Sequence, residues 1–193
     1  MIGSGPSLMM RSVAWLLGAA IRKKRGTLEE HRRRLLTRPP TEAPGPTAGI
    51  RRLCDVREET GPDGFRTYVL TPRGAAPTLE ILYIHGGAYL YEMVWPQWKM
   101  LEKLIEVTGA AVTVPVYPLA PEHDYRATYD MIGPIYADLV KKAGADRVVL
   151  CGDSAGGGFS VAFAQKLMVD GEPLPAALLL FAPWLDITMD DPG

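Results

Sequence analysis

Cysteine and histidine are scarce in this sequence, which has two cysteines and three histidines among its 193 residues. Cys54 and Cys151 lie far apart in the chain, and Cys151 falls inside an expected buried strand. We therefore expect reduced thiols, which are typical of a cytoplasmic protein, and no disulfide framework. No Cys or His spacing typical of a metal site is present, so we predict neither a metal nor another cofactor.

An excess of charge of either sign is missing as well. The formal net charge is -1, so the chain as a whole offers no electrostatic argument for a nucleic-acid partner. Hydrophobic residues make up 47% and charged residues 22% of the sequence, which is ordinary for one globular domain with a buried core.

Long hydrophobic runs are also absent. The apolar stretch at 12–21 is shorter than the roughly 20 residues that span a bilayer. A secretory signal carries its positive charges before the apolar stretch, whereas here the basic cluster at 22–25 follows it. Two interpretations of residues 8–25 stay open: a helix that packs on the domain, and a peripheral membrane contact. A basic helix is expected at 28–36, and the prolines between 39 and 46 predict a linker.

Strand and helix signals alternate after this linker. Such alternation favours an α/β fold, with a mostly parallel sheet covered by helices on both faces and an antiparallel hairpin around the turn at 61–64. We expect strands at 53–58, 67–70, 79–84, 111–116, 147–151 and 176–181, and helices at 98–107, 129–142 and from the serine motif described next to about 169.

The most informative motif is the G-x-S-x-G sequence Gly152-Asp153-Ser154-Ala155-Gly156. Apolar strand residues precede it and a helical segment follows it, which is the strand-turn-helix context of a nucleophile elbow. Glycines on both sides allow the backbone to close around a serine held in a strained conformation. We therefore predict that Ser154 is a catalytic nucleophile.

A second glycine-rich motif, His85-Gly86-Gly87, directly follows the expected strand at 79–84. Backbone N–H groups in such a loop can stabilise the negative oxygen that forms during acyl transfer, together with the residue after the nucleophile. We predict that Gly86, Gly87 and Ala155 form this oxyanion hole and that His85 braces the loop. The alternative is a tight turn without a chemical role.

Two further sequences, Tyr117–His123 and Pro183-Trp184-Leu185-Asp186, complete a series of four motifs in order. With them the region 50–190 resembles the hormone-sensitive-lipase-like α/β-hydrolases (fold-3 family), which include bacterial acetyl esterases. The resemblance implies an α/β-hydrolase fold, supporting roles for Asp153 and Asp186, and N-terminal cap helices within residues 8–36. It also implies an N-terminal region, residues 1–46, and a partial catalytic domain, residues 47–193. Ala88 departs from the family pattern, in which a third glycine is common.

A triad base is missing from the expected position. In this fold the acid and then the histidine follow the serine, but the three histidines, His31, His85 and His123, all precede Ser154. Asp186 is an attractive substitute acid, although we favour a structural role for it. We therefore expect an incomplete chain that ends soon after its sixth strand, so that the apolar strand at 176–181 forms a sheet edge that self-associates or pairs with a partner chain.

Two functions remain open. The first is a carboxylic-ester hydrolase acting on small acyl or acetyl esters through a Ser154 acyl-enzyme. The second is a catalytically silent binding or regulatory module that retains the hydrolase scaffold.

Overall fold

The structure is a computed structural model that describes residues 27–39, 42–74 and 76–188. The chain divides into two compact units, Met1–Pro40 and Thr41–Gly193. In the first unit, helix α2 (Leu28–Leu36) begins with a reciprocal capping box between Thr27 and Glu30, which satisfies the first free N–H groups of the helix. The predicted helix at 28–36 is confirmed, whereas the stretch 8–25 lies outside the described residues.

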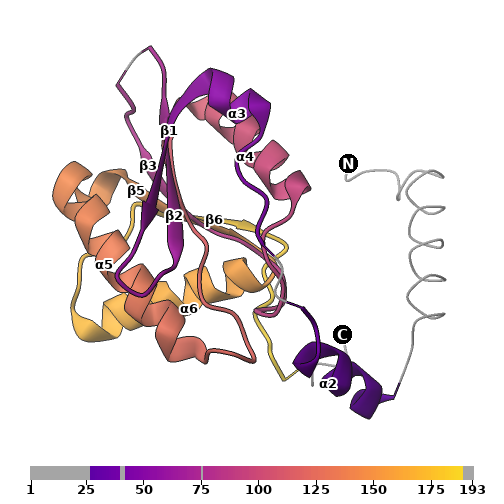
Figure 1. Cartoon of the computed structure of the whole chain (residues 1–193). Helices are drawn as coiled ribbons and strands as arrows, with labels where there is room; N and C mark the ends of the chain where they lie inside the picture. The colour runs from indigo at the N-terminus through magenta and orange to yellow at the C-terminus, as the bar shows by residue number, and fades with distance from the viewer. Residues whose placement is uncertain (1–26, 40–41, 75, 189–193) are drawn as a thin grey trace, which may run out of the picture. The chain divides into compact units, whose positions relative to one another are not determined.

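The second unit contains a six-stranded sheet in the order β1-β2-β4-β3-β5-β6 (Figure 1). The first two strands form the predicted antiparallel hairpin, β2 is also antiparallel to β4, and β4, β3, β5 and β6 run parallel to one another. The expected mostly parallel sheet is therefore confirmed. The strands are β1 (Cys54–Thr60), β2 (Arg66–Pro72), β3 (Glu80–Ile84), β4 (Ala111–Pro115), β5 (Val148–Asp153) and β6 (Ala177–Phe181).

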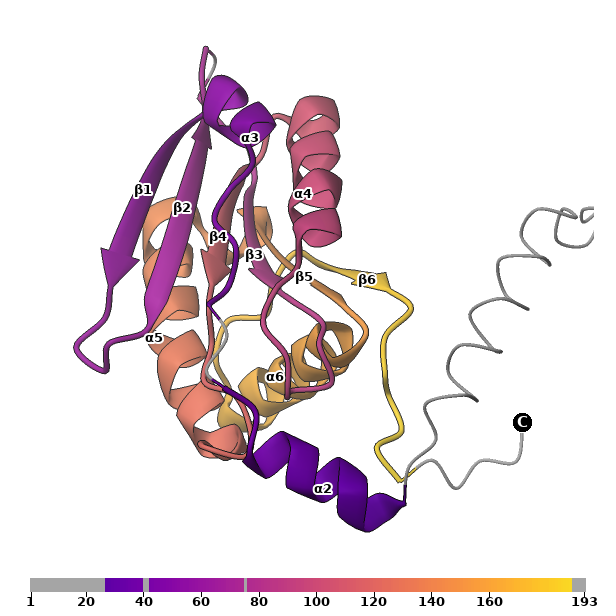
Figure 2. The same cartoon turned by 45° about the vertical axis from the view of Figure 1, so that its right-hand side comes forward.

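Helices cover both faces of this sheet (Figure 2), as the alternation of elements predicts. Successive side chains of the central strand β3 show why: Ile81 and Tyr83 join the cluster with α3 and α4, while Leu82 and Ile84 join the cluster with α5 and α6. All five residues of β3 are buried. The helices are α3 (Ala48–Leu53), α4 (Trp95–Thr108), α5 (Tyr125–Ala143) and α6 (Ala155–Asp170), with a 3-10 turn at Ala145–Arg147.

The sequence analysis missed helix α3 and the short 3-10 turn at Ala145–Arg147 among the described elements of the second unit. Thr47 caps the N-terminus of α3 by accepting a hydrogen bond from the Ile50 N–H, and Ile50 is fully buried. The helix has six residues, too few for a helical hydrophobic period to stand out beside the proline-rich linker. Helices α4 and α5 begin earlier than predicted because their first turns are polar or exposed and carry no core-facing pattern.

Both cysteines are free and buried. Burial raises the pKa of the Cys151 thiol to about 12, so the thiol is protonated at neutral pH and has low nucleophilicity. Within the described ranges, no helix has the length and apolar character needed to cross a membrane.

Helix α4 provides a direct test of the packing against the sheet. Leu101 is fully buried in the core cluster, whereas Val107 on the same helix is 72% exposed. Replacing Leu101 by Ala should lower the free energy of unfolding by about 2–5 kcal/mol, because it removes buried methyl groups and leaves a cavity. Val107→Ala should change it by less than about 0.5 kcal/mol. Urea unfolding followed by circular dichroism would measure both, and equal losses would contradict the described packing of α4.

Candidate active site

Ser154 lies between β5 and α6, in the turn that the motif predicts. Its backbone has φ 49° and ψ -118°, a strained conformation for a residue with a side chain, and the residue is exposed. A Cβ atom on Gly152 would lie 2.4 Å from the Gly156 carbonyl oxygen, and one on Gly156 would lie 2.0 Å from the Ile84 carbonyl oxygen. Glycine is therefore required at both positions, and the predicted nucleophile elbow is present in the structure.

The segment around the end of β6 holds the Ser154 backbone from both sides. The Ser154 N–H donates to the Phe181 carbonyl at 3.0 Å, and the Trp184 N–H donates to the Ser154 carbonyl at 2.8 Å. These bonds fix the peptide groups before and after the serine. The strained elbow is thus stabilised by a part of the chain that follows it by about thirty residues.

The glycine-rich loop after β3 has an unusual backbone. Gly87 has φ 141°, and the next two residues, Ala88 and Tyr89, have φ 55° and 58°. The Gly87 carbonyl accepts hydrogen bonds from the N–H groups of Leu90 and Tyr91, which closes the loop. A Cβ on Gly87 would lie 2.2 Å from the Tyr91 carbonyl oxygen, so this close turn requires glycine.

The N–H of Gly86, one of the predicted oxyanion donors, is already used in the structure. It donates to Asp153 Oδ1 at 2.8 Å, so it cannot turn to a substrate oxygen without breaking that bond. In the described residues no backbone hydrogen bond uses the N–H groups of Gly87 or Ala88. The first N–H of α6, at Ala155, has no acceptor within its own helix. The geometry favours Gly87, Ala88 and Ala155 as donors.

Asp153 connects the loop to the sheet. Besides the Gly86 N–H, its Oδ1 atom accepts a hydrogen bond from the Tyr83 hydroxyl at 2.5 Å. Burial, together with the carboxylate of Asp153, raises the pKa of Tyr83, which therefore stays a neutral donor. The Asp153 carboxylate is occupied by these contacts, and its position supports the loop beside Ser154.

His85 is fully buried beneath the same loop. Its Nδ1 atom lies 2.8 Å from the Gly86 carbonyl, its ring stacks on Tyr117 at 4.3 Å, and the Tyr117 hydroxyl donates to the His85 carbonyl. Burial lowers the pKa of the imidazole, so it is neutral at pH 7. These contacts favour a bracing role for His85.

Asp186 lies in the loop after β6. Its Oδ1 atom accepts hydrogen bonds from the Thr188 N–H at 2.9 Å and the Thr188 hydroxyl at 2.6 Å, and its carbonyl accepts one from Trp184 Nε1. Such local bonds shape a turn. A supporting role for Asp186 stays a prediction, in agreement with these contacts.

Sequence reasoning missed three residues of this site: Tyr83, Ala88 and Gln97. Gln97, in the first turn of α4, donates from Nε2 to both Asp153 oxygens, at 3.0 and 3.2 Å. A polar residue in a first helical turn normally indicates a cap, and nothing in the local sequence indicates a partner 56 residues away. Only the tertiary structure brings these groups together.

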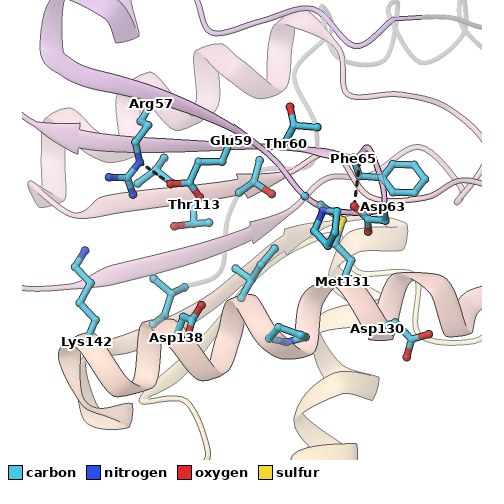
Figure 3. A pocket seen from close by; sticks show the side chains of 17 residues that line it. Arg57, Glu59, Thr60, Asp63, Phe65, Thr113, Asp130, Met131, Asp138 and Lys142 are labelled. Carbon is cyan, nitrogen blue, oxygen red and sulfur yellow. Dashed lines mark hydrogen bonds and ion pairs between the residues drawn. The ribbon is translucent and has the colours of Figure 1, made fainter.

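A groove of about 520 Å³ lies between the β1–β2 hairpin and α5 (Figure 3). Its lining residues all precede the elbow in the sequence. Val69, Thr113 and Met131 contribute to its lining, and Arg57 pairs with Glu59 at 2.6 Å along its side. None of the predicted site residues lines this groove. It is therefore separate from the candidate active site.

Comparisons with known proteins agree with this geometry. A family model described as an alpha/beta hydrolase fold matches residues 81–192. A triacylglycerol lipase of Mycobacterium tuberculosis is 36% identical over 130 residues, which cover 65% of this chain and 29% of the lipase. An esterase of Acinetobacter venetianus is 34% identical over 116 residues, covering 60% of this chain and 38% of the esterase.

A solved structure of an esterase from the bacterial hormone-sensitive lipase family aligns with a TM-score of 0.65 and 27% identity. The alignment covers 95% of this chain and 60% of the esterase. The chain thus spans 29% and 38% of the length of the two curated relatives above.

The buried, neutral His85 predicts a specific pH dependence of stability. Its pKa is lowered on folding, so the unfolded state, with a pKa of about 6.5, binds a proton first as the pH falls. The protein should lose stability below about pH 6.5, by up to about 1.4 kcal/mol per pH unit for this one group. His85→Asn should be less stable than the wild type at pH 7.5. Its free energy of unfolding should fall less than that of the wild type when the pH is lowered to 5.

Urea unfolding at pH 7.5, 6.5 and 5.0 would measure this dependence. His123→Asn is the matched control, because His123 is exposed, and it should keep the wild-type dependence. Parallel curves for the wild type and His85→Asn would show that His85 does not carry the effect.

The close approach of the loop to Asp153 can also be tested with alanine. A Cβ on Gly86 would lie 2.4 Å from Asp153 Oδ2 and 2.8 Å from the Asp153 carbonyl oxygen, so Gly86→Ala must displace the loop. The expected loss of stability is about 1–3 kcal/mol. Gly133→Ala on α5 meets no atom within 4 Å and should be neutral or stabilising by up to about 1 kcal/mol. Thermal melts of both variants would measure these changes in stability. An unchanged melting temperature for Gly86→Ala would contradict the described contact with Asp153.

Proposed function

Because the chain belongs to the α/β-hydrolase family and has esterases and lipases among its relatives, we propose that it carries the nucleophile and oxyanion hole of a carboxylic-ester hydrolase. The substrates would be small acyl or acetyl esters. The observation that carries the proposal is the exposed, strained Ser154 beside a loop that presents the free N–H groups of Gly87 and Ala88.

The chemistry follows from this arrangement. The Ser154 hydroxyl oxygen attacks the ester carbonyl, and the oxygen that becomes negative accepts hydrogen bonds from Gly87, Ala88 and Ala155. Ala155 is the first residue of α6, so the positive end of the helix dipole adds to the stabilisation. The alcohol leaves, and water then hydrolyses the acyl-enzyme.

The serine needs a base to take its proton. His85 is buried and bonded to the Gly86 carbonyl, and His123 makes an edge contact with the Phe65 ring at 5.2 Å. Neither of these histidines hydrogen-bonds Ser154 in the described part of the chain. We therefore propose that the base and its acid come from outside the described residues.

The alternative function is a catalytically silent binding or regulatory module. The engagement of both His85 and Asp153 in structural contacts favours it, because neither group is available to activate the serine. The two proposals differ in one property, which is whether Ser154 becomes acylated.

The domain division stays a proposal. Its N-terminal part, residues 1–46 with cap helices within 8–36, rests on the resemblance in sequence, as does the catalytic body, residues 47–193.

A peripheral membrane contact through residues 8–25 concerns a stretch outside the described residues. The two free, buried cysteines support the cytoplasm as the compartment.

Strand β6 supports a proposal about partners. In the described sheet it pairs with β5 and stands last in the strand order. Its side chains Leu178 and Phe181 are 39% and 38% exposed. An apolar edge of this kind favours pairing with a further strand, either from a partner chain or from a second copy of this one.

The proposed function predicts that Ser154 is acylated by an activated ester when a small base is supplied. With p-nitrophenyl butyrate and imidazole, the wild type should hydrolyse the ester faster than imidazole does without protein, because enzymes that lack a triad member still accelerate the reaction about 10³-fold relative to water. Intact-protein mass spectrometry should show one butyryl group per chain. Ser154→Ala should show neither the rate nor the adduct.

Ser160→Ala is the matched control, because Ser160 lies on α6, the helix that follows Ser154, and its hydroxyl donates to the Gly156 carbonyl. This variant should behave like the wild type. Equal rates for the wild type and Ser154→Ala, without an adduct, would refute the hydrolase proposal and favour the silent module.

A further inference from the structure

The side chain of Gln97 lies between two parts of the candidate site. Its Nε2 atom lies 3.0 Å from Asp153 Oδ2 and 3.3 Å from the Gly86 carbonyl oxygen. We propose that Gln97 is a positioning residue: its neutral amide holds the oxyanion loop in place by donating simultaneously to the Asp153 carboxylate and to the Gly86 carbonyl. The inference rests on the proposed function, since it concerns the loop that would bind the oxyanion.

The orientation of the amide is determined by its partners. Gln97 Oε1 accepts a hydrogen bond from the Val94 N–H at 2.7 Å, at the start of α4. Because an N–H donor needs an acceptor and a carboxylate needs a donor, the oxygen must face Val94 and the nitrogen must face Asp153. Both ends of the side chain are therefore fixed, one by the helix terminus and the other by the site.

The hydrogen bonds from Gln97 Nε2 to Asp153 and to the Gly86 carbonyl help to restrain the peptide groups on both sides of Gly86. Its N–H donates to Asp153, and its carbonyl is approached by Gln97 Nε2 and by His85 Nδ1. With both groups held, the next N–H groups in the chain, at Gly87 and Ala88, have a fixed direction. Loss of Gln97 leaves the carboxylate and the carbonyl each with one donor fewer, and the loop gains freedom.

The neutrality of Gln97 is part of the proposal. The Asp153 carboxylate accepts hydrogen bonds from the Tyr83 hydroxyl, the Gly86 N–H and the Gln97 amide, none of which carries a charge. A glutamate at position 97 has the same shape but directs a second carboxylate at the first. Two carboxylates this close cannot both ionise without strong repulsion, so one proton is held between them at low pH.

The surrounding titratable groups do not compensate for that repulsion. Burial keeps Tyr83, Tyr117 and Cys151 protonated and neutral by raising their pKa values, and it lowers the pKa of His85, which is neutral as well. Glu92 is a further group nearby, and its negative charge also raises the pKa of Tyr117. The added carboxylate would meet no cation among these groups.

The experiment measures protection of backbone amides by hydrogen exchange and mass spectrometry, as protection factors for the loop 85–91. Gln97→Ala should lower the protection of this loop by about ten- to hundredfold, the range expected for losing a hydrogen bond to a charged group. Gln97→Glu should lower it at least as much at pH 8. At pH 5 its protection should return toward the wild-type value, because the shared proton restores a donor.

Gln165→Glu is the matched control, since Gln165 is an exposed glutamine on α6, and it should change nothing at either pH. Strand β5 serves as the internal reference for the integrity of the fold. Unchanged loop protection in Gln97→Ala would overturn the proposal. So would an equal loss in β5 and the loop, or a loss in Gln97→Glu that is the same at pH 5 and pH 8.

These outcomes are separate from the test of ester hydrolysis. If the loop responds as expected while Ser154 is never acylated, the positioning role of Gln97 stands as a property of the loop and the hydrolase proposal fails. If Ser154 is acylated while the loop does not respond, the hydrolase proposal stands and the role of Gln97 fails.

Discussion

The close approach of helix α6 to strand β3 is the constraint on which the site depends. A single added carbon on Gly156 would lie 2.0 Å from the Ile84 carbonyl oxygen, so backbone packs directly against backbone at this point. This contact brings the N-terminus of α6 to the carboxyl ends of the parallel strands, where the glycine-rich loop also begins. The strain at Ser154 is a consequence, because the chain must reverse within one residue between a strand and a helix that are in contact.

The parts of the site that depend on local sequence were predictable. The elbow follows from glycine spacing between an apolar strand and a helix, and the sheet follows from alternating periods of two and 3.6 residues. The hydrogen bond of the Gly86 N–H was not predictable, because its acceptor, Asp153, is 67 residues away in sequence. Gln97 was missed for the same reason. Sequence patterns identify which groups can donate, whereas the fold decides which of them are already used.

A half-buried carboxylate organises the polar part of the site. Asp153 receives hydrogen bonds from strand β3, from the loop after it and from helix α4, through Tyr83, Gly86 and Gln97. Charged groups inside a protein are costly unless they are hydrogen-bonded, so these three elements are held in one arrangement by the requirement to satisfy one side chain. Such rigidity would suit the proposed oxyanion role, in which the N–H groups of the loop point at a charge before it develops.

Ser154 forms two backbone hydrogen bonds with Phe181 and Trp184, which are synthesised after it. The conformation of Ser154 therefore depends on the order in which the chain is synthesised. Residues emerge from the ribosome from the N-terminus, and a domain folds as its parts become available. While residues 181–184 are still inside the ribosome, the peptide groups of Ser154 lack their partners and have no reason to keep a strained conformation. The serine can therefore hold its strained conformation only after residues 181–184 have left the ribosome and supplied these two backbone hydrogen bonds.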